Sequence, residues 1–484
     1  MEQLGKVCLK RLKRLREKAS WKTKKERLEL FHQLHDLIYN WTGKLPNLWD
    51  IFLPEEMDWI LVQDIKNCCK RNSKLSGGFI IEFVIRAGYK DRPEIDDDGK
   101  PLLRRTTAVH YAAKKYEYSF IHDLFKIYDR FDVNYVDDDG LSHFHVACQL
   151  DCTDVVEKFL ELGQDPNSRV QQTGDSPLHS AVSTSRDCIE VVKLLIENGA
   201  DPNSANEEGT TALHMISNRI YYYEYVFRDF VQTFFKIIED RRRTIQLEAR
   251  DNLGRTALEL AVATLAPELV RILLDRGADI SNLVFPTELG EGVDKMFDEY
   301  YDVFEMRVAS RVLAVLDCLE QRGYQLDRGG ILAVMKLFLK HECFRRSSEA
   351  TAFFDLYVLD GRSFEAHAKK MMINPSLSLH ELVRLRPGEA EKRLTYLDYY
   401  KLTSQKIRNI HHSERKKYVC TAYLNEIMAR GFCRRGALDF FLELTHYRLP
   451  VLCCERIFDY LGNEDLCRIG LATDVRTPKF VTAH

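Results

Sequence analysis

A cassette that recurs along the chain limits the fold more than any other feature. The segments GQDPNSRVQQTGDSPLHSAV (163–182) and LIENGADPNSANEEGTTALHMI (195–216) share an Asp-Pro-Asn-Ser turn, a glycine and a Leu-His block. A catalytic centre needs one site, whereas a repeated cassette forms a row. The sequence therefore predicts a tandem array of structural units that bury one another's apolar faces.

The Leu-His block belongs to a pattern, similar to Thr-Pro-Leu-His-x-Ala, that occurs five times. Its copies begin at Thr107, Ser142, Ser176, Thr211 and Thr256, so successive starts are 35, 34, 35 and 45 residues apart. Between them lie segments of helical apolar spacing that end at glycine or a substitute, at 120–134, 155–167, 191–203 and 269–281. These residues resemble the ankyrin repeat, whose period is about 33 residues. The resemblance implies an all-α solenoid of helix-turn-helix repeats with β-turn tips.

The array is predicted to span residues 73–285, with five repeats and an N-terminal capping half-repeat. The half-repeat is inferred from an apolar run that ends at Ala87-Gly88, and VFPTELGEG (284–292) breaks the pattern at the other end. An aromatic insertion lengthens the last gap. It predicts either a lengthened outer helix or an exposed aromatic patch for a partner. Its aromatic residues are Tyr221, Tyr222, Tyr223, Tyr225, Phe227, Phe230, Phe234 and Phe235.

The turn tips between repeats form the predicted target-binding surface, because their sequences vary while the frame repeats. Most tips are acidic or neutral, which favours a target protein with basic groups, mainly through the association rate. The candidate target-binding residues are Tyr135, Asp137, Asp138, Asp139, Arg169, Gln171, Gln172, Asn206, Glu207, Glu208, Arg250 and Asp251.

Four repeats carry a histidine at the same position of the pattern. His110, His145, His179 and His214 recur once per repeat, and a spacing of roughly 10 Å is too large for a shared metal with bonds of about 2 Å. We expect each of them to form hydrogen bonds that link the turn at the start of its repeat's first helix to the neighbouring repeat. The sequence also lacks a phosphate-binding loop, a His-Glu-x2-His motif, a Gly-x-Ser-x-Gly motif and paired Cys-x2-Cys spacing. We therefore predict no metal, no cofactor and no enzymatic activity.

Residues 1–72 form a predicted helical segment with a basic start. Residues 1–27 hold eleven Lys and Arg against three Glu, with apolar residues near helical spacing. Such a helix either packs on the next segment with its charged face in water, or contacts an anionic membrane or nucleic acid. The whole chain has a formal net charge of −3, so no global field draws it to either. We expect no nucleic-acid partner and no membrane span, since no apolar run approaches about 18 residues.

The C-terminal part is predicted to be helical, as a linker domain at 286–400, a domain at 401–476 and a tail at 477–484. Leu449-Pro450 followed by two short amphipathic helices resembles an F-box. Together with the repeats, the segments RPGEAEKRLTYLDYYKL (386–402) and ARGFCRRGALDFFLELTHYRLPVLCCERI (429–457) resemble the PRANC domain of ankyrin proteins from poxviruses and parasitoid wasps. That resemblance implies an adaptor-binding end with the residues Leu449, Pro450, Leu452, Ile457, Leu461, Asp465 and Leu466.

The predicted function is accordingly a non-catalytic protein-interaction adaptor. The repeats would capture a target protein, and the F-box-like end would recruit the adaptor subunit of an SCF-type cullin-RING ubiquitin ligase. The alternative is an ankyrin scaffold or effector whose C-terminal domain is purely structural. Thirteen cysteines without disulfide-scaffold spacing, and no apolar core of signal-peptide type in the first residues, favour the cytoplasm or the nucleus.

Overall fold

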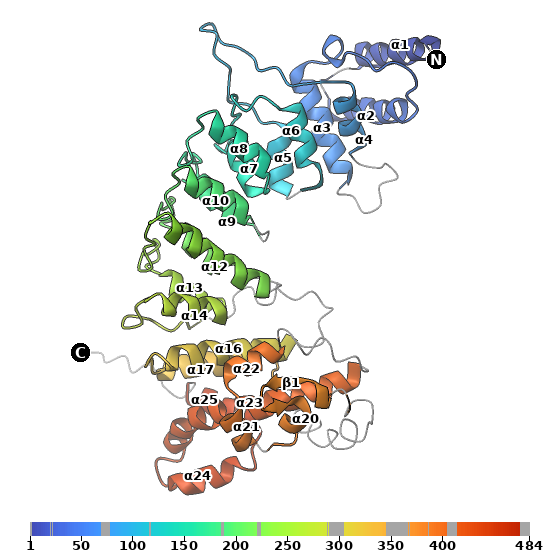
Figure 1. The fold of residues 1–484 in the computed structure, drawn as a ribbon. Coiled ribbons are helices and arrows are strands. Elements are labelled where there is room, and N and C mark those ends of the chain that lie inside the picture. Colours follow the sequence, from blue (N-terminus) through green and yellow to red (C-terminus); the bar gives the residue numbers. More distant parts are fainter. Residues whose placement is uncertain are drawn as a thin grey trace, which may run out of the picture. The chain divides into compact units, whose positions relative to one another are not determined.

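The computed structural model of the 484-residue chain is mostly helical. It describes residues 2–19, 21, 23–68, 78–115, 118–184, 188–219, 224–287, 289, 304–344, 366, 368–385, 387–403 and 414–474. The chain divides into two compact units, of which the first comprises Met1–Ile216 and Thr233–Ile245 and the second Ser217–Gln232 and Gln246–His484 (Figure 1). The predicted tail at 477–484 lies outside the described residues.

The first unit contains helices and two short 3-10 turns. They are α1 (Glu2–Lys18), α2 (Lys24–Tyr39), η1 (Leu48–Asp50), α3 (Pro54–Cys68), α4 (Phe79–Arg86), α5 (Ala108–Lys115), η2 (Tyr118–Phe120), α6 (Ile121–Ile127), α7 (His143–Gln149), α8 (Thr153–Glu161), α9 (Pro177–Val182) and α10 (Ile189–Glu197). The helices α11 (Ala212–Ser217) and α12 (Glu224–Asp240) have residues in both units.

The second unit contains helices and one two-stranded antiparallel sheet. Its elements are α13 (Ala257–Ala263), α14 (Pro267–Asp275), α16 (Phe304–Glu320), α17 (Arg328–Lys340), β1 (Met372–Asn374), β2 (Leu377–Ser378), α20 (Leu379–Leu382), α21 (Pro387–Arg393), α22 (Tyr396–Lys401), α23 (Glu414–Leu444), α24 (Val451–Phe458) and α25 (Asn463–Asp474). Across both units, no helix among the described residues has the length and apolar character that crossing a bilayer requires.

Stacked helix pairs form the repeats of the first unit. First helices pack on first helices, as α5 does on α7 and α7 on α9, while α8 and α10 pack together as second helices. The pattern residues start these helices: Ser176 caps α9 with a capping box, and Pro177 occupies its first turn. Gly163 and Gly199 have positive φ after α8 and α10, which confirms the predicted helix ends.

The N-terminal cap of the stack is a complete helix pair, whereas the sequence pattern indicated half a repeat. Helix α3 packs on α5 and α4 packs on α6, so α3 supplies the missing first helix. The Asp64 carboxylate of α3 accepts the backbone N–H groups of Ile80 and Ile81 at 3.0 Å each, and so caps α4. The pair escaped sequence analysis because α3 lacks the six-residue pattern.

The aromatic insertion forms the lengthened helix α12. Its described aromatic side chains, Phe227, Phe230, Phe234 and Phe235, are all buried. The exposed-patch interpretation is therefore wrong for these four residues. Tyr221, Tyr222 and Tyr223 lie outside the described residues, as does the side chain of Tyr225.

The last repeat and the C-terminal helices pack continuously within the second unit. Helix α14 packs on α16, and Arg322 beyond α16 donates to the carbonyl of Leu274 at 3.0 Å. Helix α16 packs on both α22 and α23, while α23 packs on α21, α24 and α25. The boundary predicted at residue 400 thus falls inside α22, within one packed body. The buried Asn425 amide joins its parts: it accepts from the Tyr399 hydroxyl at 2.5 Å and donates to the Cys343 carbonyl at 2.9 Å.

Candidate protein-binding surfaces

The recurrent histidines lie inside the stack, and His145 and His179 join one repeat to the next. The imidazole of His145 contacts the Ser142 hydroxyl at 2.7 Å and the carbonyl of Ser168 at 3.2 Å. His179 repeats the arrangement with Ser176 and with the carbonyl of Thr210. Burial lowers the pKa of His145 to about 4, so its ring is neutral near pH 7. The predicted structural role is confirmed for His145 and His179, whereas His110 is buried and contacts Thr107 in its own repeat. The described residues contain no cluster that could hold a metal ion.

Three predicted target-binding residues are buried, so the prediction that they are exposed is wrong. The Asp137 carboxylate accepts the backbone N–H groups of Asp139 and Leu141 at 3.0 and 2.9 Å and pairs with Lys114. Asp251 holds its own tip in the same way, through the N–H groups of Leu253 and Arg255. A tip needs an inward side-chain oxygen because its turn leaves these donors without backbone partners.

The third buried residue is Tyr135. Its hydroxyl donates to the Asp91 carboxylate at 2.5 Å, and its ring lies beneath the Arg105 guanidinium, whose carbon is 5.2 Å from the ring centroid. Tyr135 therefore belongs to the polar core beneath the tips. Asn206 takes the place of Asp137 in its tip, since its side chain accepts from Glu208 and Thr210, and it is half-buried.

The remaining tip residues of the first unit form a mostly exposed row. Asp138, Arg169, Gln171, Gln172, Glu207 and Glu208 in the first unit are exposed, as is Arg250 in the second, while Asp139 is half-buried. Neighbouring tips of the first unit are bonded to each other: Gln172 donates to Asp139 at 3.2 Å and Arg169 to Ser204 at 3.2 Å. The row is thus ordered before any partner arrives, which reduces the entropy cost of binding.

Two glycines let adjacent tips approach so closely. Gly140 has φ +87°, and a Cβ there would lie 2.5 Å from the Cβ of Gln171 and 2.6 Å from its backbone nitrogen. A Cβ on Gly174 would lie 2.9 Å from the backbone nitrogen of Glu207. Each turn therefore rests against the backbone of the next, and only glycine fits at the contact.

The tips provide a prediction from one matched pair of variants. Asp137→Ala is expected to lower the free energy of unfolding by about 1–3 kcal/mol, because two buried N–H groups lose their acceptor. Asp138→Ala, at the exposed neighbour, is expected to change it by less than about 0.5 kcal/mol. Urea unfolding of both variants measures the difference, and coincident curves would contradict the inward role of Asp137.

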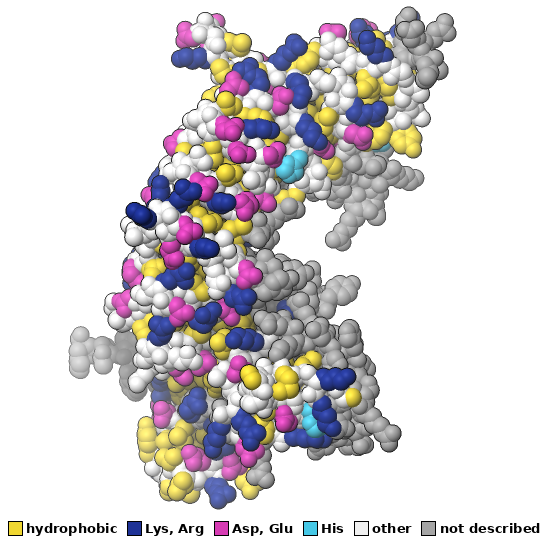
Figure 2. Space-filling view, viewed as in Figure 1, with side chains coloured by type: hydrophobic (Ala, Val, Ile, Leu, Met, Phe, Trp, Pro, Cys, Tyr) yellow, Lys and Arg dark blue, Asp and Glu magenta, His cyan; other side chains and the backbone are white. Residues whose placement is uncertain are grey.

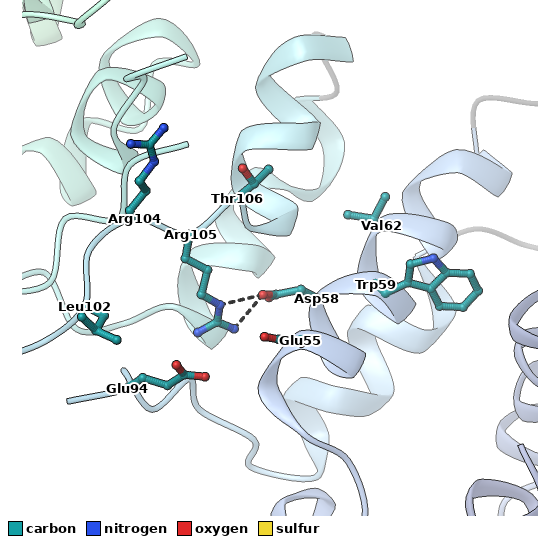
Figure 3. Close-up of a pocket in the computed structure, with 9 residues that line it drawn as sticks. All are labelled: Glu55, Asp58, Trp59, Val62, Glu94, Leu102, Arg104, Arg105 and Thr106. Carbon is teal, nitrogen blue, oxygen red and sulfur yellow. Dashed lines mark hydrogen bonds and ion pairs between the residues drawn. The ribbon is translucent and has the colours of Figure 1, made fainter. Parts of the chain in front are cut away.

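A cavity of about 360 Å³ lies in the first unit between α3 and the extended segment before α5 (Figure 3). Its lining residues are Glu55, Asp58, Trp59, Val62, Glu94, Leu102, Arg104, Arg105 and Thr106. Glu55 on α3 and Glu94 on the extended segment are exposed, so the cavity presents carboxylates from two different elements. Sequence analysis missed it, because its walls come from residues about 40 positions apart.

A buried ion-pair cluster forms the floor of this cavity. The Arg105 guanidinium contacts the Asp58 carboxylate at 2.7 Å and the Asp91 carboxylate at 2.9 Å. The hydroxyl of Tyr128 also donates to Asp58. Burial raises the pKa of Asp58 to about 6, although Arg105 and Tyr128 act to lower it. The floor sets one guanidinium against two carboxylates, and Glu55 and Glu94 add exposed carboxylates at the surface that would attract a cationic group.

An exposed apolar face lies on and around α24 in the second unit, where Figure 2 shows hydrophobic side chains gathered. Leu452 is 75% exposed and Tyr460 is 90% exposed, and Tyr447, Val451 and Ile457 extend the face. The opposite side of α24 buries Cys454 and Phe458. Arg430 and Arg434 of α23 fix the helix, since they donate to the carbonyls of Phe458 and Glu455.

The predicted adaptor-binding residues divide between this face and the core. Leu452, Ile457, Pro450 and Asp465 are exposed, and Leu449 and Leu461 are half-buried. Leu466 has no exposed surface, so the prediction that it contacts an adaptor is wrong: α25 turns it inward toward the packed body. Asp465 also accepts the backbone N–H of Gly462 at 3.0 Å. Val451, Tyr447 and Tyr460 were missed, because an apolar stripe does not show which of its sides faces a neighbouring helix.

A rigid frame of stacked helix pairs that carries variable, exposed tips defines a repeat array of the kind that binds proteins. The family model for ankyrin repeats (3 copies) matches residues 109–206 and, overlapping them, residues 178–283. The resemblance to ankyrin repeats is thereby confirmed, and such arrays are typically non-catalytic interaction modules. The match does not include the C-terminal residues, for which the F-box-like and PRANC resemblance stays a prediction. No curated protein matches the chain.

Proposed function

We propose that this chain is a non-catalytic adaptor that holds a target protein on the first unit and presents the α24 face to a second partner. The cross-bonded row of exposed tips is the observation that carries the first half. Preordered side chains on a rigid frame bind without a large ordering cost. The chain would act in the cytoplasm or the nucleus, where its cysteines stay reduced.

The target should carry basic groups. Asp138 and Glu208 are exposed on their tips, and Glu55 and Glu94 stand at the cavity beside α3. A Lys or Arg side chain entering that cavity would meet the exposed carboxylates of Glu55 and Glu94, above a floor in which two carboxylates share the Arg105 guanidinium. Complementary charge of this kind acts mainly on the association rate and weakens as salt rises.

The second partner follows from the F-box-like resemblance. It would be the adaptor subunit of an SCF-type cullin-RING ubiquitin ligase, bound on Leu452, Ile457 and the neighbouring exposed side chains. The exposed apolar side chains on this short, fixed helix support the proposal, because exposed apolar patches often serve as protein interfaces. The alternative is an ankyrin scaffold in which α24 only closes the C-terminal body, and the buried Cys454 and Phe458 favour it.

Charge reversal tests the target-binding half. Asp138→Lys with Glu208→Lys is expected to slow association with the target, after crosslinking mass spectrometry has identified it, and to flatten the salt dependence of the rate. The matched control is Glu157→Lys with Glu161→Lys, which makes the same charge change on the outer helix α8. Equal loss in both variants would place the binding face away from the tips.

Calorimetry tests the ligase half. Leu452→Asp with Tyr460→Asp is expected to weaken micromolar binding of the SCF adaptor at least about 30-fold, as truncations of interface anchors do. Leu162→Asp, at an exposed leucine of the first unit, is the control and should bind as the parent does. If the parent itself shows no heat of binding, the scaffold alternative stands.

A further inference from the structure

The outward face of α1 is mostly cationic. Lys10, Arg11, Lys13, Arg14 and Lys18 are all exposed. At 100° per residue they fall within an arc of roughly 160° on one side of the helix. Glu17 is the one acidic residue of that arc. A net surplus of this size is unusual on a chain whose formal net charge is −3.

These five cations have no ion-pair partner among the residues that the structure describes. Some cations elsewhere in the same unit are paired, as Lys114 is with Asp137 and Asp139. The exposed face of α8 mixes signs, with Glu157, Lys158 and Glu161. Like charges three and four residues apart on a helix repel each other. Solvation alone therefore does not account for a helix face whose charges are nearly all positive.

The cationic face is also fixed in place. On the opposite side of α1, Leu12 is buried against the unit and Arg16 forms a two-point hydrogen bond with Glu56, at 2.8 and 2.5 Å. The Arg16 guanidinium also lies over the Trp21 ring, with 5.8 Å from its carbon to the centroid. The prediction that α1 packs on the following segment is therefore right for one side of the helix. It does not explain why the opposite side carries cations. Lys24 and Lys25 at the start of α2 are exposed as well.

We propose that this face docks the protein on the surface of a membrane that contains anionic lipids. Lys and Arg attract acidic headgroups, with an effect of about fivefold in partitioning for each residue near the surface. The exposed apolar side chain of Val7 favours a membrane over a nucleic acid as the partner of this face. It is 65% exposed, and at 100° per residue its direction from the helix axis falls between those of Arg14 and Lys18, inside the cationic arc.

An apolar side chain in that position reaches the boundary of the acyl chains when the cations contact headgroups. Against a nucleic acid it would meet only phosphate and sugar. The exposed arc from Val7 to Lys18 also brings no aromatic side chain for base stacking and no amide for base edges. Membrane docking through α1 would involve neither the target nor the second partner.

Co-sedimentation of the full chain with vesicles tests the proposal. Binding is expected with 7:3 phosphatidylcholine:phosphatidylserine vesicles at low salt, little binding with phosphatidylcholine alone, and release at high salt. The triple change Lys10→Gln, Arg14→Gln and Lys18→Gln should reduce partitioning about 100-fold, from about fivefold per cation. The matched control Lys369→Gln, Lys370→Gln and Lys392→Gln makes the same charge change in the second unit and should bind as the parent does.

Two further measurements decide the interpretation. Val7→Ser is expected to weaken vesicle binding severalfold while leaving any binding to a 20-base-pair duplex DNA unchanged. If the parent binds the duplex but not the anionic vesicles, or if the control loses binding as the triple variant does, the proposal is overturned. Circular dichroism checks that the triple variant folds. Should it unfold, Arg11→Gln with Lys13→Gln gives the same test with about a 25-fold expected loss.

Discussion

Replacing Leu195 by alanine is expected to lower the free energy of unfolding by about 2–5 kcal/mol, as other buried Leu-to-Ala changes do. Leu195 lies on α10 with no exposed surface, between the neighbouring repeats. A cavity there weakens the packing of α10 on both α8 and α9. Because a repeat array is held together by contacts between neighbours, the loss should spread to the adjacent repeats.

The control for this variant is Leu162→Ala, which removes the same atoms from an exposed side chain just after α8. Urea unfolding should show a shift for Leu195→Ala and almost none for Leu162→Ala. If the two variants unfold at the same urea concentration, the repeat register that buries Leu195 is wrong.

The Arg105→Ala variant should lose about 3–5 kcal/mol at pH 7, since removing one member of a buried ion pair leaves the remaining charges uncompensated. Asp58 would lose its guanidinium partner inside the unit, and so would Asp91. The control is Arg104→Ala at the exposed adjacent position, which should be nearly neutral.

A pH series separates the lost charge from lost packing. Burial already raises the pKa of Asp58 to about 6, against an ordinary value of 3.8. A raised folded-state pKa means that the folded form binds the proton more tightly, so protonation of Asp58 favours folding and this contribution is lost as pH rises through about 6. Without Arg105 the pKa rises further. The deficit of Arg105→Ala should therefore be largest above pH 7 and shrink toward pH 5, and a deficit independent of pH would indicate lost packing alone.

The sequence predicted the repeat frame well because its signals are local and periodic. Ser176 and the apolar residues around Leu195 recur at fixed offsets, and each offset has a physical cause in a helix cap or a buried face. The direction in which a single side chain points was harder to predict from the sequence. Asp137 and Asp138 are neighbours of the same type, yet only the first turns inward, because the turn geometry and not the residue type decides which carboxylate meets the unpaired N–H groups.

The same limit applies at the C-terminal end and beside α3. Leu452 and Leu466 both belong to apolar stripes, and only the packing of α24 and α25 on α23 decides that one is exposed and the other buried. The cavity beside α3 depends on Glu55 and Glu94, which no local pattern connects. A site whose residues come from separate elements can be recognised only once the tertiary structure is known.

Because each tip contacts the backbone of the next tip, substitutions and insertions should affect this surface differently. Exposed side chains such as Asp138 and Glu208 can be replaced without moving the turn that carries them. An inserted residue, in contrast, would displace the turn beneath Gly140 or Gly174, and with it the neighbouring tip. New binding specificities can therefore arise on this scaffold one substitution at a time, whereas a change in tip length has to be accommodated by two repeats at once.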